Sequence, residues 1–77
     1  MNASIHLNLF ATLKQSMPPG ADNYPIQAGS SVAQILRQLD IPPDKAKLIF
    51  VDGVKGSLQT ILQGGERVGV FPPVGGG

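Results

Sequence analysis

The last seven residues, FPPVGGG, could place a reactive carboxylate at the end of the chain. Glycine has no Cβ, so three terminal glycines leave the carboxylate of Gly77 unobstructed as it approaches another molecule. One hypothesis is that this carboxylate enters the active site of another protein and is activated there by ATP as an acyl-adenylate. The alternative is that the glycines form an inert end, because chain ends are often frayed.

The residues before the glycines would suit a tail that threads into a partner. From Pro73 to Gly77 the chain can extend about 13–18 Å, at about 3.3–3.6 Å per residue, which would reach a recessed site. Pro72 and Pro73 have a fixed φ and would keep the base of the tail extended. Phe71, Pro72 and Val74 would form an apolar patch suited to docking. These residues alone leave a second interpretation open. The terminal glycines could be the remnant of a linker, and FPP could simply end a strand.

No other group of residues predicts an enzyme site. His6 is the only histidine, at an outward position of a predicted strand. Ser30 and Ser31 resemble helix caps and have no nearby base to activate them. The segments GVKGS (53–57) and GGERVG (64–69) lack the order of phosphate or dinucleotide loops and predict turns. The acidic residues lack the spacing of a metal site or an acid–base pair: Asp22, Asp40, Asp44, Asp52 and Glu66.

Composition favours one small folded domain. The chain has 77 residues, 42% hydrophobic and 14% charged, with no cysteine for a disulfide or a thiolate metal site. The net charge is +1, and the basic residues are scattered without interleaved aromatic residues, which argues against nucleic-acid binding. Because neither a signal-peptide pattern nor an apolar run near about 18 residues occurs, we expect a soluble cytoplasmic protein without membrane contact.

Alternating polarity predicts most of the strands. Residues 24–28 predict a short strand at a sheet edge, because Pro25 removes a hydrogen-bond donor. The apolar run 47–51 predicts a central strand, and residues 66–71 alternate until two prolines end the strand. Residues 3–11 also alternate, which predicts a strand with one buried face: Ile5, Leu7 and Leu9.

One segment predicts the main helix, at residues 30–43. Ser31 and Gln34 have the spacing of a capping box, and Pro42-Pro43 predicts where the helix ends. Its apolar residues recur at helical spacing and form one stripe: Val32, Ile35, Leu36 and Leu39.

The order of these elements predicts the architecture. Residues 15–23 predict a loop, and the Asp-Gly pair at 52–53 predicts a turn. Residues 57–63 predict a short helical turn with three apolar side chains on one side: Leu58, Ile61 and Leu62. We therefore expect an α+β roll in residues 1–73, with the helix packed across a mixed four- to five-stranded sheet, and a flexible tail in 74–77.

The segment LQGGERVGVFPPVGGG resembles the C-terminus of the ubiquitin-like sulfur-carrier family, above all the small subunit of molybdopterin synthase. Weaker similarity covers nearly the whole chain, including a Phe-Ala-x-Leu run at residues 10–13. Gly75 occupies a position where members of this family commonly have alanine or serine. The family's Leu-x-x-Gly-acidic-x-Val lead-in and its Phe-Pro-Pro-Val ending match here: Leu62, Gly65, Glu66, Val68, Phe71, Pro72, Pro73, Val74, Gly76 and Gly77.

The resemblance implies a β-grasp fold and a carrier rather than an enzyme. A ubiquitin-activating-enzyme-like adenylyltransferase would adenylate Gly77 with ATP, and a sulfurtransferase or cysteine desulfurase would supply sulfur to form a thiocarboxylate. The large subunit of molybdopterin synthase would then use that sulfur for the dithiolene of the molybdenum cofactor. Residues 71–76 would contact these partners, and the chain would bind no metal or cofactor itself.

Related functions stay open. The VGGG ending is also similar to the carrier that supplies sulfur to the thiamin thiazole, but the long loop from Lys14 to Asn23 and the Phe-Pro-Pro run favour molybdopterin. Carriers that supply sulfur for other thio-metabolites share this tail. A ubiquitin-like modifier would instead join its terminal glycine to lysines of other proteins. A plain interaction module with an inert tail is the remaining alternative.

Overall fold

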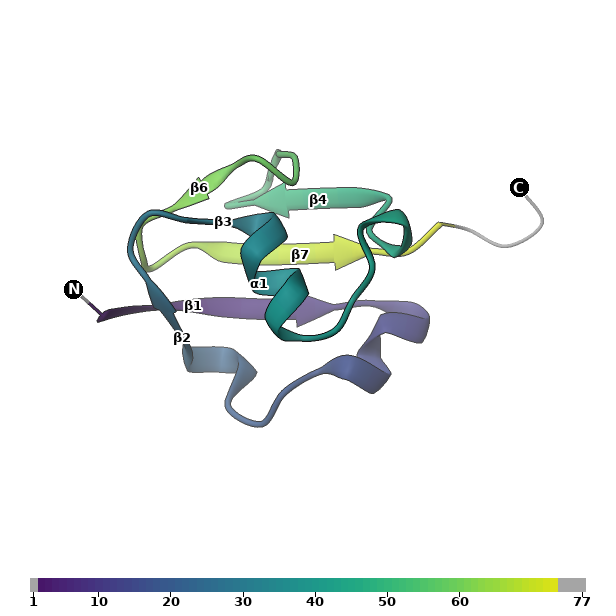
Figure 1. Ribbon diagram of the computed structural model, residues 1–77, viewed down its shortest axis with the longest axis horizontal. Helices are drawn as coiled ribbons and strands as arrows, with labels where there is room; N and C mark the ends of the chain where they lie inside the picture. The colour runs from purple at the N-terminus through teal and green to yellow at the C-terminus, as the bar shows by residue number, and fades with distance from the viewer. Residues whose placement is uncertain (1, 74–77) are drawn as a thin grey trace.

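A five-stranded mixed sheet forms the main layer of the computed structural model, which describes residues 2–73. Its strand order is β2-β1-β7-β4-β5, and only β1 and β7 run parallel (Figure 1). The strands are β1 (Asn2–Leu9), β2 (Tyr24–Gln27), β4 (Leu48–Val51), β5 (Val54–Lys55) and β7 (Arg67–Phe71). The predicted mixed sheet and the edge position of β2 are confirmed. The strand predicted to be central, β4, lies between β7 and β5, and the middle strand of the five is β7.

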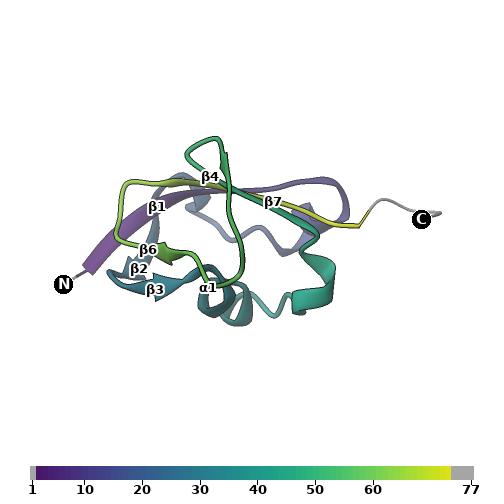
Figure 2. The ribbon, with the colours of Figure 1, turned by 90° about the horizontal axis from the view of Figure 1, so that it is seen from above.

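Within residues 2–73 one α-helix, α1 (Val32–Gln38), covers one face of this sheet (Figure 2). A small antiparallel pair, β3 (Ser30–Ser31) and β6 (Ile61–Leu62), lies on the same side (Figure 2). The core between the layers is wholly apolar. It consists of Ile5, Leu7, Leu9, Leu13, Ala21, Ile26, Val32, Ile35, Leu36, Ile41, Ile49, Leu62, Val68 and Val70.

The start of α1 is fixed by the predicted capping box. The backbone N–H of Gln34 donates to Ser31 Oγ at 3.2 Å, and the Ser31 N–H donates to Gln34 Oε1 at 2.7 Å. These two bonds satisfy donors that the first turn of a helix leaves free. Val32, Ile35 and Leu36 are buried as predicted.

The end of α1 differs from the prediction. The helix stops at Gln38, well before Pro42, so the prolines do not terminate it. Asp40 instead adopts a left-handed conformation with φ of 59°, which turns the chain out of the helix. The N–H of Ile41 bonds to the Leu36 carbonyl at 2.9 Å and satisfies one of the last helical acceptors.

Three short segments also differ from expectation. The predicted helical turn at 57–63 is wrong, because Ile61–Leu62 forms β6, which buries Leu62 and leaves Ile61 51% exposed. The loop expected at 15–23 contains part of a 3₁₀ helix, Ala11–Ser16, and a second, Ala21–Asn23. The turn expected at 53–57 includes β5, which forms a hairpin with β4. Only the β6 difference depends on a partner distant in sequence, because Ile61–Leu62 pairs with Ser30–Ser31, whereas β5 pairs with the neighbouring β4 and the 3₁₀ helices are local turns.

Candidate functional site

Strand β7 holds the base of the C-terminal segment at the centre of the sheet. The Phe71 carbonyl accepts the Lys47 N–H at 2.8 Å, and the Val70 carbonyl accepts the Phe10 N–H at 3.1 Å. The next two residues are prolines, which lack an N–H and end the strand, as predicted. The remaining predicted site residues, Val74, Gly75, Gly76 and Gly77, lie outside the described residues.

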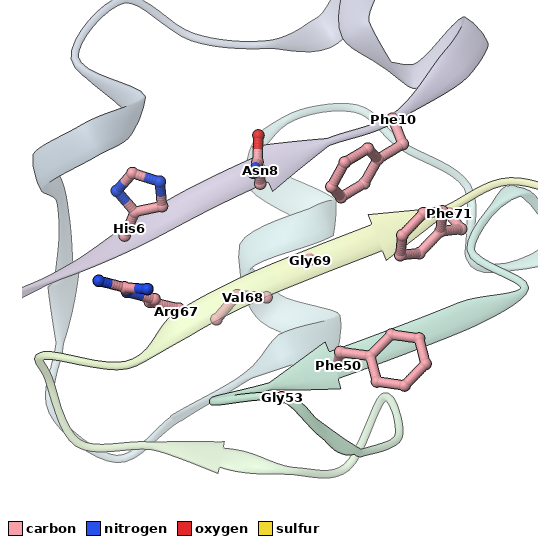
Figure 3. Close-up of a pocket in the computed structure, with 9 residues that line it drawn as sticks. All are labelled: His6, Asn8, Phe10, Phe50, Gly53, Arg67, Val68, Gly69 and Phe71. Carbon is pink, nitrogen blue, oxygen red and sulfur yellow. The ribbon is translucent and has the colours of Figure 1, made fainter.

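All three phenylalanines of the chain meet on the sheet face opposite α1 (Figure 3). The rings of Phe10 and Phe71 stack in parallel, with centroids 4.1 Å apart, and Phe50 meets Phe71 edge-on at 5.9 Å. Each of the three side chains is half-buried. We call these three residues the aromatic face, and it provides apolar area where the C-terminal segment begins.

Only Phe71 of the aromatic face was predicted as a site residue. Parallel pairing of Leu9 with Val70 brings Phe10 beside Phe71, and antiparallel pairing places Phe50 diagonally across from Phe71. Period-two alternation could have assigned Phe10 to the outward side of its strand, but strand order was needed to join the three rings. One basic residue, Lys55, pairs with Phe50 in the register of β4 and β5.

A hollow of about 330 Å³ lies on this sheet face. Gly69 lies within it, between Asn8 and Phe50 in the sheet register. A Cβ at Gly69 would lie 3.4 Å from Cε2 of Phe10. His6 and Arg67 lie toward one end of the hollow, and the aromatic face lies toward the other (Figure 3).

A second apolar hollow, of about 340 Å³, adjoins the predicted docking residues Pro72 and Pro73. Leu48 and Phe71, which pair across β4 and β7, contribute to it. Ala11 also lines it and has a positive φ of 54°, which bends the chain directly after Phe10. Phe71 therefore borders both hollows, and the two prolines extend from the edge of the aromatic face.

The turn that precedes β7 is held by the side chain of Glu66. Glu66 Oε2 accepts the Gln63 N–H at 2.8 Å, and Oε1 accepts the Gly64 N–H at 2.7 Å. Gly64 has φ of 122°, and a Cβ there would lie 2.6 Å from Cβ of Ala3, so this position requires glycine. The carboxylate of this motif thus organises the turn that leads into β7.

The described residues contain no second site with obvious chemistry. His6 Nδ1 lies 3.5 Å from Asp22 Oδ1, but the two side chains are 43% and 90% exposed. Within residues 2–73, no three His, Cys, Asp or Glu residues gather as metal ligands, and no buried side-chain polar atom lacks a partner. None of the helices in that range is long and apolar enough to span a membrane.

Comparison with known proteins places this arrangement in a family. The ThiS family model matches residues 7–77. A search of curated protein sequences found no match.

Three solved structures with the same fold come from Haloferax volcanii and Pyrococcus furiosus. The Haloferax volcanii HVO 2177 protein has a TM-score of 0.72 and 21% identity, over 99% of this chain and 88% of its own. A Pyrococcus furiosus protein assigned as molybdopterin converting factor, subunit 1, has a TM-score of 0.63 and 25% identity, over 94% and 99%. SAMP1 from Haloferax volcanii has a TM-score of 0.65 and 20% identity, over 97% and 100%. The chain therefore has the β-grasp fold and belongs to the ThiS family of ubiquitin-like sulfur carriers.

Proposed function

We propose that this protein carries sulfur as a thiocarboxylate on Gly77 and donates it as the small subunit of molybdopterin synthase. The observation that carries the proposal is the FPPVGGG ending directly after the central strand of a ThiS-family chain. The similarity to the Pyrococcus furiosus molybdopterin converting factor subunit supports the choice of pathway.

The chemistry takes place on the terminal carboxylate inside partner proteins. A carboxylate oxygen of Gly77 attacks the α-phosphorus of ATP on an adenylyltransferase, which forms the acyl-adenylate and releases pyrophosphate. A sulfurtransferase or cysteine desulfurase then presents a cysteine persulfide, whose outer sulfur attacks the Gly77 acyl carbon and displaces AMP. A thiol next attacks the inner sulfur of the resulting acyl disulfide, which releases the thiocarboxylate and leaves a disulfide between the two thiols. The large synthase subunit consumes the thiocarboxylate. The chain is a protein co-substrate in this scheme, and ATP binds to the activating partner.

The described part of the chain contributes recognition. The aromatic face and the exposed Pro73 provide apolar area beside the point where the tail starts. Aromatic residues are enriched among the anchors of protein interfaces. Val74 would extend this apolar contact, and Gly75 and Gly76, which have no side chains, would then thread toward the reaction centre until Gly77 reaches the nucleotide.

A carrier for the thiamin thiazole or another thio-metabolite is the second candidate. The matching model is that of the ThiS family as a whole, and the VGGG ending is similar in thiazole carriers. A ubiquitin-like modifier would use the same activation and differ in the acceptor, which would be a lysine of another protein.

Intact-mass measurement distinguishes these candidates. The chain is incubated with its adenylyltransferase, ATP and a sulfur source, and a chain that lacks Gly76 and Gly77 serves as the control. Replacement of one oxygen by sulfur in the full chain alone is expected for a carrier, whereas branched conjugates in cell lysate indicate a modifier. An unchanged mass with a partner of demonstrated activity would contradict both. Addition of candidate large subunits then shows which one consumes the thiocarboxylate.

A further inference from the structure

A groove of about 470 Å³ lies on the α1 side of the molecule, whereas the aromatic face lies on the other side of the sheet (Figure 2). The exposed side of α1 forms one wall, and the segment that follows the helix forms the other. The lining residues are Ala33, Gln34, Arg37, Asp40, Ile41, Pro42 and Pro43. None of them belongs to the aromatic face or to the C-terminal segment, so the proposed function leaves this groove unused.

Much of the groove wall is rigid before anything binds to it. Burying alanine or proline costs no side-chain entropy, which applies here to Ala33, Pro42 and Pro43. The side chain of Gln34 is already held by the capping box, where its Oε1 accepts the Ser31 N–H at 2.7 Å. Pro42 and Pro43 are exposed. A partner that covers them therefore orders few free side chains, which lowers the cost of association.

The groove carries one positive and one negative side chain. Arg37 lies in the last turn of α1, and Asp40 lies two residues after the helix ends at Gln38. Both side chains are exposed, and neither forms an ion pair within residues 2–73. The two charges are therefore available to groups on another molecule.

Asp40 is not the residue that the local structure favours at its position. Its φ of 59° is left-handed, and helix ends with this conformation usually carry glycine or asparagine. Its carboxylate also follows the C-terminal end of α1, where the helix dipole disfavours negative charge. Residues that break local rules are often found at functional sites. A cation on another molecule would give this aspartate a role.

A second copy of the chain matches both charges at once. In a two-fold symmetric contact the same surface faces itself, so residue i meets residue j and residue j meets residue i. An axis that passes between Arg37 and Asp40 would place each arginine beside the aspartate of the other copy. The net charge of only +1 offers little resistance to self-association.

Other occupants match the groove less well. An acidic partner would face Asp40 and a basic partner would face Arg37, and either arrangement brings like charges together. Small ligands are ordinarily oriented by a few polar groups inside a pocket. The buried residue of this groove is Ile41, whose side chain has no polar atom.

We propose that this groove is a homodimer interface, in which Arg37 of each copy pairs with Asp40 of the other across a two-fold axis. The contact would leave both aromatic faces uncovered, so each copy could still meet its own partner. The inference goes beyond the sulfur-carrier proposal and does not depend on it. The groove is small, and small interfaces form weak, transient complexes.

Exchange of the two charges tests the interface, by sedimentation velocity of the whole chain from about 10 μM to about 1 mM. Arg37→Asp alone would bring four carboxylates together, and Asp40→Arg alone would bring four guanidinium groups together. Each variant should weaken dimerisation about tenfold or more. An equimolar mixture of the two should associate within about threefold of the wild type, since every arginine then faces an aspartate. A monomeric wild type at the highest concentration, or a mixture that does not associate, would overturn the interface.

A further variant keeps the test decisive if Asp40→Arg does not fold. Ala33→Glu adds a larger, charged side chain to the groove, and glutamate is a good helix former that is favoured in the first turn. The variant should melt near wild type at low micromolar concentration and should not dimerise. A dimer retained by folded Ala33→Glu would overturn the proposal.

Two controls locate the contact. Lys55→Asp makes a similar charge change on β5 and should dimerise like the wild type. Phe71→Ala alters the aromatic face and should also leave the dimer intact. A dimer that Phe71→Ala removes and Arg37→Asp retains would place the contact on the aromatic face and overturn the proposal.

Discussion

The two faces of the sheet are made from alternate residues of the same strands, yet they differ in chemistry. The face under α1 is aliphatic, and Leu7, Leu9 and Val70 have at most 1% of their surface exposed. The open face carries all the phenylalanines, which are half-buried, together with His6 and Arg67. This difference teaches that apolar residues serve two purposes here. The covered set stabilises the fold, and the uncovered set is available to a partner.

The largest expected effect comes from breaking the covered face. Leu36→Asp places a carboxylate where the leucine is 1% exposed and where the surrounding core contains no polar residue, and this should cost several kcal/mol. The variant should therefore lack a cooperative thermal transition in circular dichroism. Arg37→Asp, at the next and exposed position, is the matched control and should melt near wild type. A cooperative Leu36→Asp melt at the control temperature would show that this face does not hold the fold.

A substitution at the terminal residue distinguishes the reactivity of the carboxylate from binding by the sheet faces. Gly77→Val adds a branched side chain beside the reacting carboxylate, and misplacing a reacting atom by about 1 Å can cost about 100-fold in rate. Adenylation should collapse, while binding measured by calorimetry without ATP stays within about tenfold. Wild-type adenylation by Gly77→Val would contradict the steric requirement for a terminal glycine.

A smaller effect is expected from breaking the open face. Phe71→Ala removes the ring that contacts both Phe10 and Phe50, so affinity for the adenylyltransferase should fall about tenfold. The rate at saturating partner should change less. Ile61→Ala removes an exposed apolar side chain from the helix side of the sheet and should leave affinity unchanged. If both variants bound equally well, the open face would have no special part in recognition.

The smallest effect is expected at Glu66, the acidic residue of the family motif, which belongs to neither face of the sheet. Glu66→Gln keeps the size of the side chain but loses the charge that strengthens the bonds to the Gln63 and Gly64 N–H groups. Its amide oxygen can accept one of them, so the free energy of unfolding measured in urea should fall by only about 1 kcal/mol. Asp44→Asn, at an exposed position, is the control for the charge change. Loss of adenylation by a stable Glu66→Gln protein would mean that the acid acts directly.

Local patterns in the sequence predicted much of the fold. Ile5, Leu7 and Leu9 alternate with polar residues, and the structure buries all three. Ser31 and Gln34 formed the expected capping box. The weakest predictions were short segments such as Ile61–Leu62, whose structure depends on pairing with Ser30–Ser31. Short segments have too few residues for periodicity to distinguish a turn of helix from a strand.

The sequence alone was enough to identify the FPPVGGG tail, the strand that two prolines end before it, and the family resemblance. All three depend on residues that are adjacent in the chain. Only the tertiary structure decided that Phe10, Phe50 and Phe71 form one face, and that Gly69 leaves a hollow beside them. Strand order and register bring these residues together, and both depend on which segments pair across the sheet. Pairing is set by burial of the whole core rather than by any local pattern.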